Sequence, residues 1–172
     1  MPGSNDERLV IERVKNHGEF KATLVSLTMT GDLPALEAQV SAVGRRWFQL
    51  ARMHHADASA VDPTLSPRSV YSRAYYSAYN ASKAVRYIVQ GFVSLRGDDH
   101  QKVANLPDTF PDVDAWSAKL PLLYEHRLRA DYDNWTNTPS ENQLSASECL
   151  DAAGEFLAVA EQFLLSEYGI VI

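Results

Sequence analysis

The chain has 172 residues, of which 45% are hydrophobic, and its formal net charge is −6. This length is typical of one domain, and the apolar share is enough for one core, which excludes global disorder. The acidic balance argues against a broadly basic protein that wraps nucleic acid. The single cysteine, Cys149, excludes an internal disulfide and a multi-cysteine metal site.

The sequence contains no signal for a membrane or for export. No run approaches about 18 consecutive apolar residues, so we expect no membrane span. The first ten residues, MPGSNDERLV, lack the apolar core of a secretion signal. These features predict a cytoplasmic protein.

Residues 1–31 are expected to form an extension that precedes a helical domain over residues 32–172. Two runs in the extension, 8–14 and 19–28, flank the sequence KNHG and are rich in β-branched residues. This pattern is compatible with a β-hairpin, and for the first run also with a short helix.

Four later segments have apolar residues at the spacings of three and four that are typical of an amphipathic helix. The predicted helices cover residues 33–56, residues 67–90, residues 113–131 with Pro121 as a break or a fresh start, and a last segment from a capping box at Ser140 and Gln143 to a terminator at Gly169. Each helix has one apolar stripe, and this pattern predicts an all-α helical bundle.

Charge is distributed unevenly along the chain. Residues 68–102 carry six basic and two acidic groups, whereas residues 103–172 carry three basic and twelve acidic groups. A basic middle in an acidic chain predicts either an anion site or a solvated helix face, and composition does not choose between the two.

The segment YEHRLRADYDNW, residues 124–135, concentrates charge at a predicted helix end. Arg127 and Asp131 are four residues apart, as are Arg129 and Asp133, so both pairs can form ion pairs on the helix surface. Exposed ion pairs contribute only about 0.2–1 kcal/mol. The alternative is an anion site, in which an acid and a phenol hold the planar donor fork of an arginine.

A second segment, residues 72–87, interleaves aromatic and basic side chains. Its tyrosines and cations are Tyr75, Tyr76, Tyr79 and Tyr87 with Arg73, Lys83 and Arg86. Aromatic rings beside cations can stack bases and bind phosphates, whereas tyrosines on one helix can also simply fill the core. A small-residue stripe of Ala74, Ala78 and Ala81 lies beside the tyrosines, which we interpret as exposed, and suggests contact with a second copy of the chain.

No cofactor motif is present, because the chain lacks a Walker loop and the patterns GxGxxG, HExxH and GxSxG. The adjacent His54 and His55 point about 100° apart on a helix, so we expect no metal there. Cys149 lies on the apolar stripe of the last predicted helix and is interpreted as a core thiol. We therefore expect neither a metal nor a cofactor.

Three sequences occur in order: RAYYSAYNASKA (73–84), DDHQKV (98–103) and LLYEHRLRADYD (122–133), followed by a long amphipathic helix. This ordered set, spanning residues 33–168, resembles the HEPN superfamily, the higher eukaryotes and prokaryotes nucleotide-binding domain. The resemblance implies an up-and-down four-helix bundle that is often dimeric. It also implies either a ribonuclease of a toxin–antitoxin, defence or RNA-processing system, or a non-catalytic protein that binds nucleotides or pairs with a nucleotidyltransferase.

The resemblance also implies the site residues. Nuclease members carry the pattern R-x4-6-H, in which Arg127 matches the arginine, while Tyr132 stands where the shortest form of the pattern has histidine. A histidine position of the second helix is Asn80. Histidine moves protons near neutral pH, so the catalytic candidates are Arg127, Tyr132 and the loop residue His100. The residues expected to bind RNA or a nucleotide are Arg73, Tyr76, Asn80, Arg127, Arg129, Asp131 and Tyr132.

Three functions are therefore weighed. The first is a dimeric, catalytically degenerate HEPN-like component of a prokaryotic toxin–antitoxin, defence or nucleotidyltransferase-associated system, which binds RNA or a nucleotide. The second is an active, metal-independent endoribonuclease. The third is a helical protein-interaction module with no nucleic-acid role.

Overall fold

The computed structural model describes residues 15–94, 97–133 and 143–172, and within these ranges every regular element is helical. The elements are α2 (His17–Ser26), the 3₁₀ turn η1 (Thr30–Asp32), α3 (Leu33–Ser59), α4 (Pro67–Gln90), the 3₁₀ turn η2 (Gly97–Lys102), α5 (Val113–Tyr132) and α6 (Ala146–Tyr168). The all-α prediction is confirmed for this part of the chain. None of the described helices is long and apolar enough to cross a membrane.

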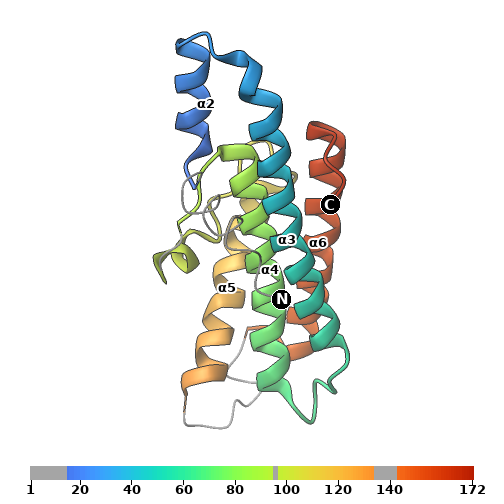
Figure 1. Cartoon of the computed structure of the whole chain (residues 1–172). Helices are drawn as coiled ribbons and strands as arrows, with labels where there is room; N and C mark the ends of the chain where they lie inside the picture. The colour runs from blue at the N-terminus through green and yellow to red at the C-terminus, as the bar shows by residue number, and fades with distance from the viewer. Residues whose placement is uncertain (1–14, 95–96, 134–142) are drawn as a thin grey trace.

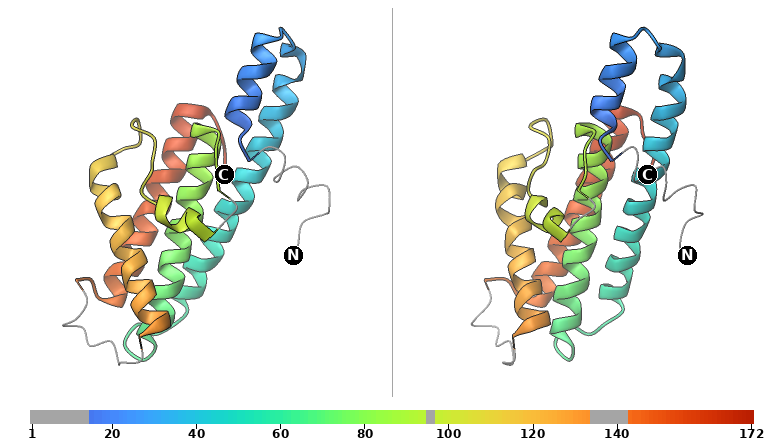
Figure 2. Two further views of the ribbon diagram at one scale, coloured as in Figure 1. Left: turned by 90° about the vertical axis from the view of Figure 1, so that its left-hand side faces the viewer. Right: turned by 60° about the vertical axis from the view of Figure 1, so that its left-hand side comes forward.

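The helices α3, α4, α5 and α6 run alternately up and down (Figures 1 and 2). α4 is the central helix, because α3, α5 and α6 each pack against it. Its alanines at positions 74, 78, 81 and 84 are fully buried, and small side chains let neighbouring helices approach closely. The stripe of Ala74, Ala78 and Ala81 therefore lies in the core of one chain, and the prediction that it faces a second copy is wrong.

Local signals explain most of the observed helix ends. Pro67 lies in the first turn of α4, and Gly91 ends that helix in the left-handed conformation (φ 75°), so the predicted range 67–90 is confirmed. Gly169 ends α6 in the same way (φ 64°), as predicted. α5 is one continuous helix that includes Pro121, which is neither a break nor a fresh start.

The predicted start of the last helix is wrong. α6 begins at Ala146, where the Ser145 hydroxyl accepts the backbone N–H of Glu148 at 3.2 Å and the Glu148 carboxylate accepts the N–H of Ser145 at 2.7 Å. This reciprocal capping box satisfies two donors at the helix end. Ser140, the expected cap, lies outside the described residues.

The N-terminal segment is helical in a region whose pattern was compatible with a β-hairpin. Residues 19–28 largely form α2, and residues 8–14 lie outside the described part of the chain. The Gly18 N–H donates to the Gly91 carbonyl at 3.0 Å, and the Val93 N–H donates to the Lys15 carbonyl at 3.0 Å, which attaches the start of α2 to the end of α4. Beyond this contact α2 packs alongside α3, and Lys21 of α2 forms an ion pair with Glu37 of α3. The hairpin prediction therefore fails, because within α2 the backbone hydrogen bonds are made along the helix and need no partner strand.

Candidate functional site

The candidate site lies where η2 meets α4 and α5. The 3₁₀ turn places the His100 ring against aromatic side chains of both helices: its centroid is 4.3 Å from that of Tyr79, and it is almost parallel to Tyr124 at 5.8 Å. His100 Nδ1 and the Tyr75 hydroxyl form a hydrogen bond of 2.8 Å. The loop histidine of the sequence analysis is thus held inside an aromatic stack, partly exposed to solvent.

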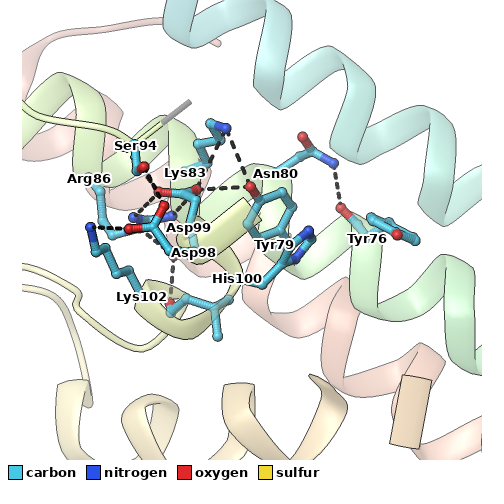
Figure 3. A network of polar contacts seen from close by, with 12 residues as sticks. Tyr76, Tyr79, Asn80, Lys83, Arg86, Ser94, Asp98, Asp99, His100 and Lys102 are labelled. Atoms are coloured by element: carbon cyan, nitrogen blue, oxygen red, sulfur yellow. Dashed lines mark hydrogen bonds and ion pairs between the residues drawn. The ribbon is translucent and has the colours of Figure 1, made fainter. Parts of the chain in front are cut away.

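The residue next to it, Asp99, is fully buried and forms the centre of a polar cluster (Figure 3). Arg86 donates from Nη1 and Nη2 to its two carboxylate oxygens at 3.1 and 3.0 Å. The Tyr79 hydroxyl and the Ser94 N–H also donate to this carboxylate, at 2.9 and 3.2 Å, and Lys83 Nζ lies 3.6 Å away. Burial acts to raise the pKa of Asp99, but the hydrogen bonds and charge of Arg86 outweigh it, so the pKa is lowered. We call Asp99 with Arg86, Tyr79, Ser94 and Lys83 the Asp99 cluster.

Arg127 of α5 lies between two phenol rings. Its Cζ atom is 5.3 Å from the ring centroid of Tyr76 on α4 and 5.2 Å from that of Tyr132. Nη2 donates to the Tyr76 hydroxyl at 2.8 Å, and Nε forms an ion pair with Asp131 at 2.8 Å. The predicted Arg127–Asp131 pair is therefore present. Tyr132 is 68% exposed, so one face of this arrangement is open to solvent.

Arg129 does not pair with Asp133 as expected from the spacing. It forms an ion pair with Glu125, one turn earlier. Asp133 is the C-cap of α5 and has extended backbone angles, so it has left the helix surface on which an i,i+4 pair could form. Its carbonyl instead accepts Arg68 Nη2 at 2.8 Å.

Arg73 joins the same surface through a residue of a third helix. Its Nη1 is 3.1 Å from Nδ1 of His54 on α3, and the His54 ring lies 5.5 Å from the Tyr76 ring. Burial, followed by the charge of Arg73, lowers the pKa of His54. Tyr76 therefore contacts both Arg127 and His54, which is the hydrogen-bond partner of Arg73. We call Arg73, His54, Tyr76, Arg127 and Tyr132 the arginine surface.

His100 borders this surface. Its ring lies 6.1 Å from that of Tyr76, the same ring that faces Arg127. Burial and then the charge of Arg127 lower the pKa of His100, which favours a neutral imidazole at pH 7. By contrast, His126 is buried in the core, where its Nε2 accepts the Leu144 N–H at 3.3 Å.

Two predicted site features have a structural role in the fold. Asn80 is only 6% exposed, and its amide donates to the Tyr76 carbonyl one turn earlier, at 2.7 Å. Three tyrosines of the segment 72–87 are buried, as the core interpretation expected: Tyr75, Tyr79 and Tyr87. The interpretation of the tyrosines beside the alanine stripe as exposed is therefore wrong for these three. Burial raises the pKa of Tyr87 to about 12. Burial likewise raises the pKa of Cys149 to about 12, and this thiol is 1% exposed, which confirms it as a core residue.

Sequence reasoning did not identify several residues that shape the site. Asp99 and Arg86 lie in the quoted segments 98–103 and 72–87, but nothing in one sequence indicates that they pair across 13 positions. Tyr124 and His54 were also not assigned to the site. His54 is on α3, far along the chain, so only the packing of α3 on α4 brings it there.

The chemistry available to the site comes from arginine side chains beside aromatic rings and from His100, whose lowered pKa favours the neutral imidazole. Among the residues that the structure describes, no group of three or more histidine, cysteine or acidic side chains is arranged to hold a metal. An arginine fork binds phosphate oxygens, and an exposed phenol ring stacks on a base.

Comparisons of this chain with protein-family models, with curated proteins and with solved structures give no match. The similarity to the HEPN superfamily therefore stays a prediction from the quoted segments.

Proposed function

We propose that this protein binds RNA or a nucleotide at the arginine surface, as a HEPN-like component of a prokaryotic toxin–antitoxin, defence or nucleotidyltransferase-associated system. The observation that carries the proposal is the Arg127 guanidinium, placed between the rings of Tyr76 and Tyr132 with Tyr132 largely exposed. The Arg127 side chain is 12% exposed and that of Asp131 is 29% exposed, so Tyr132 is the most open part of this arrangement.

The electrostatics of the surface support an anionic ligand. Arg127 is paired with one carboxylate, Asp131, which orients the guanidinium. Arg73 has the histidine His54 as its hydrogen-bond partner among the residues that the structure describes, and burial together with the Arg73 charge lowers the pKa of that histidine. The surface thus offers positive charge from two helices around one half-buried ring, which suits a phosphate beside a stacked base.

A titration with a labelled single-stranded RNA, followed by fluorescence anisotropy, tests the proposal. Wild-type protein should bind with an affinity that falls as the salt concentration rises. Arg127→Ala should weaken binding about tenfold or more and reduce the salt slope by about one, because it removes a phosphate contact. Lys119→Ala is the matched control, since it removes a charge from the same helix where Lys119 pairs with Glu155.

A second candidate function is a metal-independent endoribonuclease, and one observation favours it. His100 lies beside the ring that Arg127 faces, so a proton-transfer group and a phosphate-binding group share one surface. In the tautomer in which Nδ1–H donates to the Tyr75 hydroxyl oxygen, Nε2 is the unprotonated nitrogen that would take the proton of an attacking 2′-hydroxyl. RNA cleavage in EDTA that disappears in Arg127→Ala and His100→Ala would establish this function.

Dimerisation is part of the proposal and rests on the resemblance, since the alanine stripe is buried. Sedimentation equilibrium tests it, and a mass of 19.2 kDa at high concentration would reject it. If wild-type protein neither binds nor cleaves RNA or nucleotides, the helical interaction module becomes the better account.

A further inference from the structure

We infer that Asp99 is a positioning residue for the proposed site, because it fastens η2 to α4 and thereby holds His100 in the aromatic stack beside Arg127. The inference deepens the proposed function and rests on it for the binding measurement, whereas its spectroscopic measurement is independent of any ligand.

Tyr79 links Asp99 directly to the aromatic stack around His100. Tyr79 belongs to both: its hydroxyl donates to Asp99 Oδ2 at 2.9 Å, and its ring stacks on His100 at 4.3 Å (Figure 3). Asp99 and His100 are also neighbours in the chain. The Asp99 carboxylate is therefore connected to His100 in two ways, through the chain and through the side chain of Tyr79.

Besides the hydrogen bond between Tyr75 and His100, two further contacts attach η2 to α4. The bidentate Arg86–Asp99 contact holds its middle, and the Ser82 hydroxyl donates to the Val103 carbonyl at 2.6 Å just after its end. Arg86 Nε in turn donates to the Ser82 hydroxyl at 3.3 Å, so the two attachments are joined. A turn this short makes few backbone hydrogen bonds of its own, so these side chains determine its position.

Both charged groups of the Arg86–Asp99 contact lie in the interior, since Asp99 is fully buried and Arg86 is 2% exposed. A buried ion pair is often no more stable than an apolar pair of the same size, because both ions lose their hydration. What the pair adds is geometry, since the two parallel hydrogen bonds of a bidentate arginine–carboxylate contact fix the relative orientation of η2 and α4.

The test compares Asp99→Asn with Asp98→Asn. Asp98 is the matched control: it is the adjacent acid in the same turn, is exposed, and binds Ser94 Oγ at 2.6 Å and Lys102 Nζ at 3.2 Å. In NMR spectra of the wild type and of Asp98→Asn, the ring protons of His100 should be shifted upfield by the stacked Tyr79 and Tyr124 rings. In folded Asp99→Asn this shift should be lost.

The binding measurement asks whether Asp99 acts through His100. His100→Ala should weaken RNA binding about fivefold, the size of one hydrogen bond, and Asp99→Asn should weaken it by a similar factor. The double variant should be no weaker than either single variant, because both changes remove the same interaction. If Asp99→Asn weakens binding as much in the His100→Ala background as in the wild type, the inference is wrong.

A second variant covers the case in which Asp99→Asn does not fold because Arg86 is left unpaired. Replacing Arg86 by Met together with Asp99 by Leu removes both buried charges and keeps apolar bulk. This double variant should remain helical, and the ring protons of His100 should lose the upfield shift caused by the Tyr79 and Tyr124 rings. An unchanged His100 spectrum in either folded variant would overturn the inference. Absence of any RNA binding by the wild type would reject the proposed function instead, and the spectra would still decide the role of Asp99.

Discussion

The Asp99 cluster and the arginine surface are built on the same helix, α4, yet they differ in how their charges are matched. In the Asp99 cluster a fully buried carboxylate receives donors from Arg86, Tyr79 and Ser94, all within the fold. In the arginine surface, Arg127 faces Tyr132, which is 68% exposed, and Arg73 is itself exposed. The first cluster is closed to ligands and the second is open to them. Charged residues of α4 can therefore stabilise the folded chain near one end of the helix and be available to bind a ligand near the other end.

Breaking the closed cluster should give the largest effect on stability. Asp99→Ala leaves the Arg86 guanidinium buried without its carboxylate, and loss of one partner of a buried ion pair costs about 3–5 kcal/mol. Urea denaturation measures this change in the free energy of unfolding. Asp98→Ala should leave the denaturation midpoint almost unchanged, and an equal effect of the two substitutions would contradict the contrast between a closed cluster and an exposed acid.

Breaking the open surface should act on binding and little on folding. Arg127→Ala removes a phosphate-binding fork, and we expect an affinity for single-stranded RNA that is about tenfold lower. The urea midpoint should change less than in Asp99→Ala, because the Asp131 left without its partner is 29% exposed, whereas Arg86 is buried. Anisotropy and urea titrations on the same samples separate the two effects. If Arg127→Ala lowered the urea midpoint as much as Asp99→Ala does, but bound RNA with wild-type affinity in its folded state, the roles assigned to the two clusters would be reversed.

A smaller effect is expected from the ring that joins the two arginines. Tyr76→Phe keeps the ring beneath Arg127 but removes the hydroxyl that accepts Nη2 at 2.8 Å. The affinity for RNA should fall only about two- to fivefold, since one hydrogen bond contributes about 1 kcal/mol. Tyr168→Phe, on α6, is the control and should bind like the wild type. A loss as large as that of Arg127→Ala would mean that Tyr76 itself contacts the ligand.

The smallest expected effect is the change of the free energy of unfolding with pH. Burial lowers the pKa values of His17, His54 and His100, so near pH 6.5 the unfolded chain binds more protons than the folded one. The free energy of unfolding should therefore decrease as the pH falls from 7.5 through 6.5, and it should decrease again below about pH 4, where the lowered pKa of Asp99 adds its part. Urea titrations across this range measure the slope, and greater stability at pH 5.5 than at pH 7.5 would contradict it.

The fold was predictable from sequence where one residue type dictates the local backbone. Pro67 and Gly91 bracket α4 because proline suits a first turn and glycine tolerates a positive φ. The start of α6 was not predictable in this way, since Ser140–Gln143 and Ser145–Glu148 have the same spacing, and the structure uses the second. The run 19–28 was ambiguous because its apolar residues fit neither period cleanly, and the hydrogen bond of the preceding Gly18 with Gly91 at the end of α4 is not encoded locally.

In the candidate site, too, a contact within one helix was predictable from the sequence and those between helices were not. The Arg127–Asp131 pair follows from a spacing of four on one helix and was predictable. Arg129 had an acid four residues away on either side, and only the end of α5 at Tyr132 explains why it pairs with Glu125. The contacts of Arg127 with Tyr76 and of Arg73 with His54 cross between helices, so they depend on packing that no spacing rule supplies.

The central claim is that RNA contacts the arginine surface, and the most direct test is an NMR titration of the wild-type protein with a short single-stranded RNA. The account predicts that the side-chain Nε–Hε resonance of Arg127 and the ring resonances of His100 and His54 shift together and saturate, while that of Arg52, which pairs with Glu161 on another face, stays in place. Shifts confined to other residues, or the absence of any saturable shift at this surface, would contradict the account.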